Sequence, residues 1–153
     1  MKSKKLIIFF MVLLPILFTL FGSELRHKYI KNDEEIRELA KQQVNVIQEN
    51  YNDGALLEIY NKGTNDFKKI TPEGDFLLLM KRKKEVLGYF VSSELLTSNV
   101  INSNVVILTY RSTYKNYSLI EEFQFIRKHK DDDLQLGTYF IDDGGQRGDV
   151  IMQ

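Results

Sequence analysis

The strongest structural signal in the chain lies in residues 104–128, which read NVVILTYRSTYKNYSLIEEFQFIRK. Two runs rich in β-branched and aromatic residues flank the polar dipeptide Lys115-Asn116, and this arrangement predicts a β-hairpin with a two-residue turn. With that turn, the numbers of two paired residues add up to 231, as 115 and 116 do. The pattern therefore predicts the register of the hairpin as well as its two strands.

This register separates two faces of the hairpin. The predicted core face carries the pairs Val106:Phe125, Leu108:Phe123, Tyr110:Glu121 and Ser112:Leu119. The other face is expected to meet solvent or a partner, and it carries the pairs Val105:Ile126, Ile107:Gln124, Thr109:Glu122 and Arg111:Ile120. Its apolar members, which form the predicted partner face, are Val105, Ile107, Ile120 and Ile126.

Glu121 is unusual, because it places a carboxylate on the apolar face opposite Tyr110. One interpretation is a general base or ligand-binding group, with Tyr110 as hydrogen-bond donor, in a cavity that Leu108 and Phe123 also line. The other is that the Tyr110 hydroxyl caps Glu121 at the rim, where both still contact water. No second acid or oxyanion donor is identifiable, so we favour the structural interpretation and expect no catalytic residues.

The remaining elements are read outward from the hairpin. Strands are expected at residues 88–97 and 134–142, which with 104–114 and 117–128 make a four-stranded antiparallel meander. Helices are expected before them, at residues 33–51, 55–62 and 71–84. Helices followed by strands indicate an α+β fold, in which the helices pack on a curved sheet. Residues 143–153 are expected to form a flexible tail.

Local signals support the helix boundaries. Asn32 and Glu35 have the spacing of a capping box, and Thr71-Pro72 is typical of a helix start. The third helix carries the apolar residues Phe76, Leu77, Leu79 and Met80. The basic run from Lys81 to Lys84 is expected to end that helix, where cations interact favourably with the helix dipole.

Four segments carry a resemblance to a known superfamily: Leu87-Gly88-Tyr89-Phe90, Val105–Tyr110, Glu122–Ile126 and Leu136–Ile141. With the order of elements, residues 33–142 resemble the cystatin-like cone of the nuclear-transport-factor-2-like superfamily, and small exported bacterial domains of unknown function within it. The sequence departs from this pattern at Leu134, where many relatives carry tryptophan. The resemblance implies a fold, but the superfamily includes isomerases, dehydratases, secretion-channel subunits and binding modules, so it implies no particular chemistry.

The N-terminus predicts a membrane segment. A basic start, Met-Lys-Ser-Lys-Lys, precedes residues 6–22, which read LIIFFMVLLPILFTLFG and carry no charge. The bulky Leu20 and Phe21 fit a signal-peptidase site poorly, so residues 1–23 favour an uncleaved signal-anchor over a cleaved signal peptide. Residues 24–32 would then connect a domain on the extracytoplasmic side to a single-pass cell (inner) membrane segment. Cleavage would instead give a secreted or periplasmic protein.

Composition excludes several function classes. Of the 21 basic residues, three precede the apolar segment, which leaves 18 basic against 21 acidic residues and a net charge of −3 for residues 24–153. Nucleic-acid binding is therefore not expected. The chain has no cysteine and only two histidines, His27 and His129, so no metal site or cofactor is expected. We expect a non-catalytic, membrane-tethered module that binds a protein partner or a second copy; the alternative is a small-molecule binder or isomerase-like protein that uses Tyr110 and Glu121.

Overall fold

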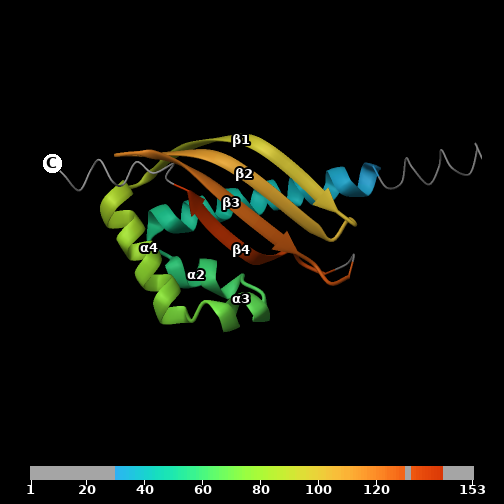
Figure 1. The fold of residues 1–153 in the computed structure, drawn as a ribbon, viewed down its shortest axis with the longest axis horizontal. Coiled ribbons are helices and arrows are strands. Elements are labelled where there is room, and N and C mark those ends of the chain that lie inside the picture. The colour runs from blue at the N-terminus through green and yellow to red at the C-terminus, as the bar shows by residue number, and fades with distance from the viewer. Residues whose placement is uncertain (1–29, 130–131, 143–153) are drawn as a thin grey trace, which may run out of the picture. The chain divides into compact units, whose positions relative to one another are not determined.

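The computed structural model describes residues 30–129 and 132–142. The chain divides into two compact units, Met1–Glu35 and Ile36–Gln153. Residues 30–53 are helical, and the part of this helix within the second unit is called helix 36–53 below. The second unit continues with α2 (Leu56–Asn61), α3 (Asn65–Ile70), α4 (Glu73–Leu87), β1 (Phe90–Ile101), β2 (Val105–Tyr114), β3 (Ser118–Ile126) and β4 (Gln135–Asp142) (Figure 1).

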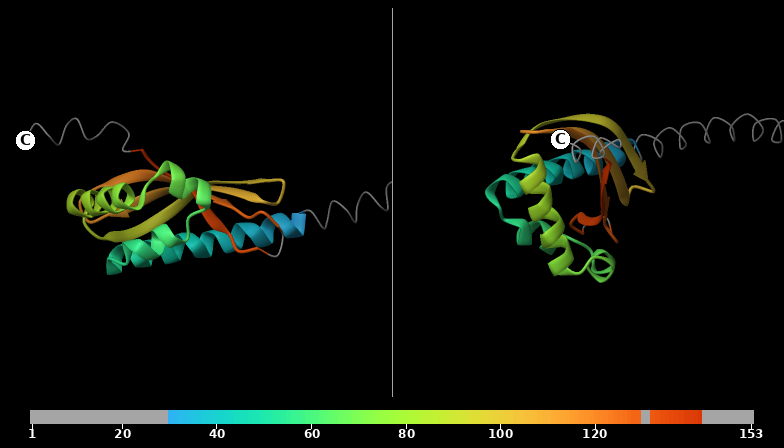
Figure 2. Two further views of the ribbon diagram at one scale, coloured as in Figure 1. Left: turned by 90° about the horizontal axis from the view of Figure 1, so that it is seen from below. Right: turned by 60° about the vertical axis from the view of Figure 1, so that its left-hand side comes forward.

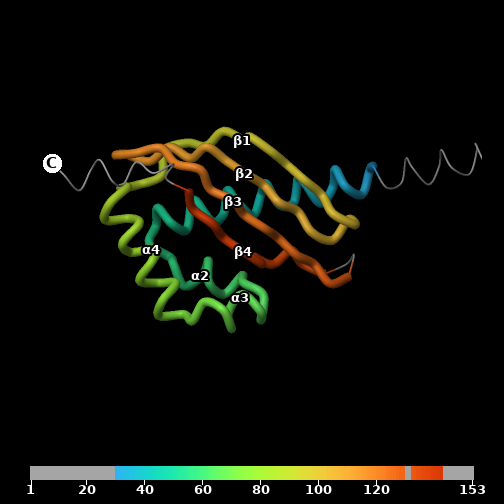
Figure 3. Tube along the Cα trace, in the orientation of Figure 1, coloured from blue at the N-terminus to red at the C-terminus, as the bar shows by residue number. Residues whose placement is uncertain are grey.

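The strands form one antiparallel sheet in the order β1-β2-β3-β4, which the tube in Figure 3 follows from one edge to the other. The predicted hairpin register is confirmed along its whole length, from Val105↔Ile126 to Thr113↔Ser118. A hydrogen bond of 2.8 Å from Tyr114 N to Tyr117 O closes the two-residue turn. The prediction of an α+β fold, with helices on a four-stranded antiparallel sheet, is confirmed.

One core lies between the sheet and the helices, and the views in Figure 2 show the sheet curving round helix 36–53. Helix 36–53 buries residues at helical spacing, namely Ile36, Ala40, Val44, Ile47 and Tyr51. Strands β2 and β3 bury alternate residues, because successive side chains of a strand point to opposite faces. The buried apolar residues on these strands are Val106, Leu108, Tyr110, Tyr114, Leu119, Phe123 and Phe125.

Two predicted helix starts are wrong. Residues 30–32 are already helical, so Asn32 lies within the helix, and the connector predicted at 24–32 is helical in its described part. These residues include no glycine or proline, which would have ended a helix there. The helix predicted from residue 71 begins at Glu73, with Pro72 in the capping position. Its buried residues are Phe76, Met80, Lys83 and Leu87, whereas the apolar Leu79 is 44% exposed.

Helix α3 was not predicted. The Thr64 hydroxyl accepts a hydrogen bond of 3.1 Å from Phe67 N, which satisfies one free N–H group at the helix start. Phe67 is the buried residue of α3 and contacts the rings of Tyr60 and Phe76. A helix of six residues with a single buried position gives too little periodicity to be found from sequence.

The hairpin turn docks on the end of α4. Asn116 N donates to Leu87 O at 3.0 Å, and the Asn116 side-chain amide donates to Val86 O at 2.9 Å. Gly88 follows α4 with a φ of 79° and lies so close to the turn that a Cβ there would be 2.9 Å from the Cβ of Lys115. Glycine is therefore favoured at position 88 for two reasons: it adopts the positive φ readily, and it has no Cβ to collide with the hairpin turn.

The remaining predictions concern residues outside the described ranges. These are the apolar segment 6–22, the first part of the connector and the tail 143–153. Among residues 30–129 and 132–142, none of the helices has the length and hydropathy needed to span a bilayer. The membrane segment therefore stays a prediction from the sequence.

Candidate functional site

Glu121 lies on the core face of β3, opposite Tyr110 as predicted, but its environment differs from the prediction. The residue is 0% exposed, so its carboxylate does not lie at a water-filled rim. None of the hydrogen bonds that the described residues donate to it comes from Tyr110. The interpretation that Tyr110 caps Glu121 at the rim is therefore wrong, because other elements supply the partners of the carboxylate.

The main partner of Glu121 is Lys83 of α4. Its Nζ lies 2.6 Å from Glu121 Oε1, 2.5 Å from the Tyr114 hydroxyl and 2.7 Å from the Tyr139 hydroxyl. An ammonium group has three N–H donors, and these three acceptors use all of them. Nζ also lies 4.5 Å from the centre of the Tyr51 ring. The cation is thus surrounded by a carboxylate, two hydroxyls and an aromatic ring.

Both carboxylate oxygens of Glu121 also accept hydrogen bonds from within the protein. The Tyr114 hydroxyl donates to Glu121 Oε2 at 2.9 Å, the Gln48 side-chain amide donates to the same oxygen at 3.0 Å, and the Tyr139 hydroxyl donates to Oε1. Both tyrosine hydroxyls therefore accept from Lys83 and donate to Glu121. We call Gln48, Lys83, Tyr114, Glu121 and Tyr139 the buried polar cluster.

The charges of this cluster shift the pKa of each titratable member. Burial alone would raise the pKa of Glu121, but the Lys83 ammonium and the hydrogen bonds to the carboxylate outweigh it and hold the pKa below 4.5. Burial lowers the pKa of Lys83 below 10.5, and the nearby carboxylate opposes part of that change. Burial, together with the charge of Glu121, raises the pKa values of Tyr51, Tyr114 and Tyr139 above 10.

This arrangement is unsuited to acid–base chemistry on a substrate. A carboxylate with a lowered pKa is a weak base, and every donor of Lys83 already has an acceptor within the protein. Leu108 and Phe123, the other two residues of the predicted cavity, are 0% and 1% exposed and belong to the core. What the cluster does is cross-link helix 36–53, α4, β2, β3 and β4 inside the domain.

The cluster contains a residue that the sequence interpretation misplaced. Lys83 was interpreted only as part of the basic run at the helix end, but its side chain is 3% exposed and belongs to the buried polar cluster. The spacing of Phe76, Met80, Lys83 and Leu87 is the one available signal, because it puts the lysine on the buried face of α4. Gln48, Tyr114 and Tyr139 were also missed, since nothing local to them indicates a shared partner.

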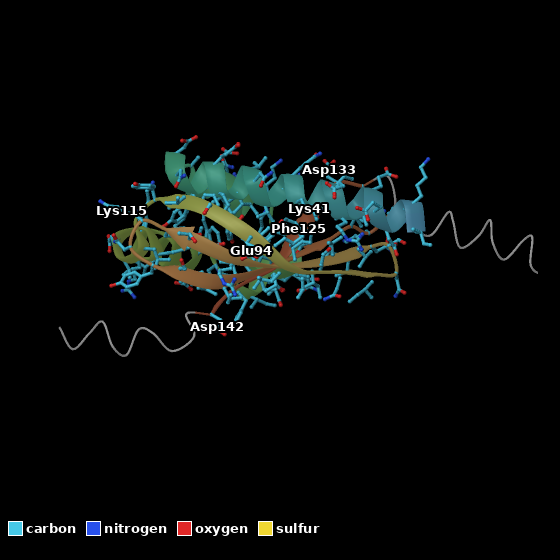
Figure 4. The ribbon with its side chains drawn as sticks, turned by 90° about the horizontal axis from the view of Figure 1, so that it is seen from above. Lys41, Glu94, Lys115, Phe125, Asp133 and Asp142 are labelled. Carbon is cyan, nitrogen blue, oxygen red and sulfur yellow. The ribbon has the colours of Figure 1, made fainter. Side chains whose placement is uncertain are left out.

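The predicted partner face lies on the opposite side of the sheet, away from helix 36–53. Val105, Ile107, Ile120 and Ile126 are each partly exposed there. In Figure 4 the helix that carries Lys41 lies along one side of the sheet. Strand pairing adds two half-exposed residues to this face, Ile101 beside Val105 and Phe140 beside Glu122. We call these six apolar residues the outer-face patch.

Part of this patch is a continuous apolar row. Ile101, Val105 and Ile126 are direct neighbours on β1, β2 and β3. Gly137 on β4 leaves room for Ile126, since a Cβ at Gly137 would come within 2.5 Å of its Cδ1 atom. The charged residues of the face include Glu94 and Arg111, which form an exposed ion pair at 3.0 Å. The row is therefore apolar, and the next residues on the same face include the polar Asn99 and Gln124, which pair with Ile107.

Comparisons with known proteins give no further assignment. No protein-family model matches the chain, and no curated protein matches it with significant sequence similarity. The resemblance to the nuclear-transport-factor-2-like superfamily therefore stays a prediction. Among the described residues, no three His, Asp or Glu side chains are placed together so as to hold a metal ion.

Proposed function

We propose that this chain is a non-catalytic binding module that contacts a protein partner, or a second copy, through the outer-face patch. The observation that carries the proposal is the row of adjacent apolar side chains Ile101, Val105 and Ile126, in which Ile101 is 47% exposed. Phe140, elsewhere on the same face, is 57% exposed. Water-exposed apolar side chains that adjoin one another are typical of interaction surfaces. In contrast, the polar side chains of the buried polar cluster form hydrogen bonds with one another inside the domain.

We further propose that residues 6–22 tether this module to the cell (inner) membrane, with the domain on the extracytoplasmic side. The support is the uncharged apolar segment behind a basic start. Protease added to intact spheroplasts should then degrade the domain, and the mass of the mature chain should include residues 1–23. A domain that is degraded only after lysis would contradict this location, and a shortened mass would identify a cleaved signal peptide.

The partner surface is tested by site-specific photo-crosslinking of the full chain in cells that produce it. A photoreactive residue at Ile107, in the outer-face patch, should give a discrete crosslinked product. The same residue at Leu78 of α4, which is 48% exposed, is the matched control and should not. The charge variant Ile120→Lys should remove the Ile107 product without unfolding the domain. Equal products from both positions, or none from Ile107, would contradict the proposal.

A further inference from the structure

The two edges of the sheet differ. On β4, Leu136 exchanges backbone hydrogen bonds with the segment before α3: Thr64 N donates to Leu136 O, and Leu136 N donates to Lys62 O, both at 2.9 Å. This contact covers the start of the β4 edge. Strand β1, at the other edge, has β2 as its one neighbouring strand within the part of the chain that the structure describes. An edge strand presents unpaired N–H and C=O groups to which another strand can bind.

Much of β1 is uncovered on both faces. Residues 91–97 are exposed without interruption, whereas β2 alternates between buried and more exposed positions. Side chains of helix 36–53 form hydrogen bonds with β1 just before and just after this segment. Asn52 exchanges hydrogen bonds with the backbone of Phe90, and Arg37 donates to the Ser98 hydroxyl. The segment between these contacts is exposed, and it includes Val91 (54%), Leu95 (36%) and Leu96 (39%).

The sequence of β1, FVSSELLTSNVI, carries few side chains that guard an edge, although two register shifts interrupt its pairing with β2. Lysine and proline, which commonly guard edge strands, are absent from it. Its one charge, Glu94, is paired with Arg111 of β2. The Asn52 side chain occupies the N–H and C=O groups of Phe90 only, so it guards the beginning of the strand and leaves residues 91–97 available.

The strand is also complementary to itself. Counted outward from Leu95-Leu96, residues of similar type recur on both sides: Glu94 and Thr97, Ser93 and Ser98, Ser92 and Asn99, Val91 and Val100. The register shift between Leu95 and Thr97 inserts one extra residue, so that Ser93 and Ser98 both face the helices, while Glu94 and Thr97 both face outward. Residues opposed in an antiparallel pair must share a face, and the extra residue meets this condition.

We propose that β1 pairs antiparallel with β1 of a second copy, about a two-fold axis near Leu95-Leu96, so that two four-stranded sheets become continuous. In this arrangement Glu94 faces Thr97 of the other copy instead of another carboxylate. The proposal goes beyond the binding function above, because it concerns the sheet edge instead of the outer-face patch. Either surface can act without the other.

The test uses cysteine crosslinking of the full chain in detergent micelles, because the natural chain has no cysteine. Two differently tagged variants, Ser93→Cys and Ser98→Cys, are mixed and oxidised. The mixture should form a disulfide-linked heterodimer, and each variant alone should form much less covalent dimer. Ile70→Cys, which places a thiol at an 83% exposed position on α3, is the control for random collision.

A second variant separates pairing from accidental crosslinking. Leu96→Lys places like charges close together at the two-fold axis and should weaken the dimer about tenfold in sedimentation equilibrium, with an unchanged circular dichroism spectrum. Val86→Lys, at a 50% exposed position on α4, should leave the dimer unchanged. A monomeric natural chain, a dimer indifferent to Leu96→Lys, or a heterodimer yield no higher than that of the Ile70→Cys control would overturn the proposal.

Discussion

Lys83 of α4 and Glu121 of β3 form a salt bridge of 2.6 Å, and their side chains are 3% and 0% exposed. Two opposite charges that leave water together lose hydration, and the structure compensates only if the remaining donors and acceptors are also satisfied. Here Gln48, Tyr114 and Tyr139 provide those further hydrogen bonds. The pair is therefore one part of a cluster whose donors and acceptors are matched to one another. We expect the removal of either member alone to destabilise the domain.

Removing one member of the pair should be more harmful than removing both. Glu121→Gln leaves the Lys83 cation without its counter-charge and should lower the free energy of unfolding by about 3–5 kcal/mol. The double variant Lys83→Met/Glu121→Gln leaves no buried charge, so its loss should be well below the sum of the losses of Lys83→Met and Glu121→Gln measured singly. Urea denaturation at neutral pH measures all three. The exposed control Glu94→Gln should cost less than about 1 kcal/mol; strict additivity of the two single changes would contradict the coupling.

Acid should remove the contribution of Glu121 to stability. Its pKa in the folded protein lies below 4.5, so the unfolded chain takes up this proton first as the pH falls. The contribution is therefore complete above the unfolded pKa and is lost as the pH falls through the folded pKa. The stability difference between the natural chain and Glu121→Gln should be constant near neutral pH and shrink below about pH 4.5. A difference that stays constant into strong acid would argue against a lowered pKa.

Alkali should destabilise the domain through its buried tyrosines. The pKa values of Tyr51, Tyr114 and Tyr139 are raised above 10, so the unfolded chain releases these protons first and the folded state loses stability above pH 10. Ultraviolet absorbance of tyrosinate follows the titration. Tyr114→Phe should leave the titration of the folded protein near pH 10 unchanged but should remove one tyrosine from the titration in urea. Loss of one group from both curves would show that Tyr114 ionises in the fold.

The junction between α4 and β1 should depend on Gly88. Gly88→Ala places a Cβ at a φ of 79° and 2.9 Å from the Cβ of Lys115, and it should cost about 1–3 kcal/mol. Gly74→Ala, in the first turn of α4, is the matched control, because no atom lies within 4 Å of the added Cβ. It should be neutral or stabilise by up to about 1 kcal/mol, since alanine favours the helix. Thermal unfolding followed by circular dichroism compares the two, and equal effects would contradict this explanation.

The hairpin of β2 and β3 follows from local sequence alone. Alternating apolar residues and the turn at Lys115-Asn116 predicted every pairing from Val105↔Ile126 to Thr113↔Ser118. Such signals act between residues that are close along the chain or opposite one another across a short turn, so they are present before the domain folds. The same holds for the α+β order and for three of the helices, apart from their ends.

The partners of Glu121 depend on tertiary structure. Gln48, Lys83 and Tyr139 are 73, 38 and 18 residues away along the chain, and no spacing in the sequence relates them. Sequence alone placed the carboxylate on the core face and showed that it was unusual there. Whether it met water, a ligand or a cation was decided by the packing of α4 and helix 36–53 on the sheet, because burial and charge pairing arise only when distant segments come together.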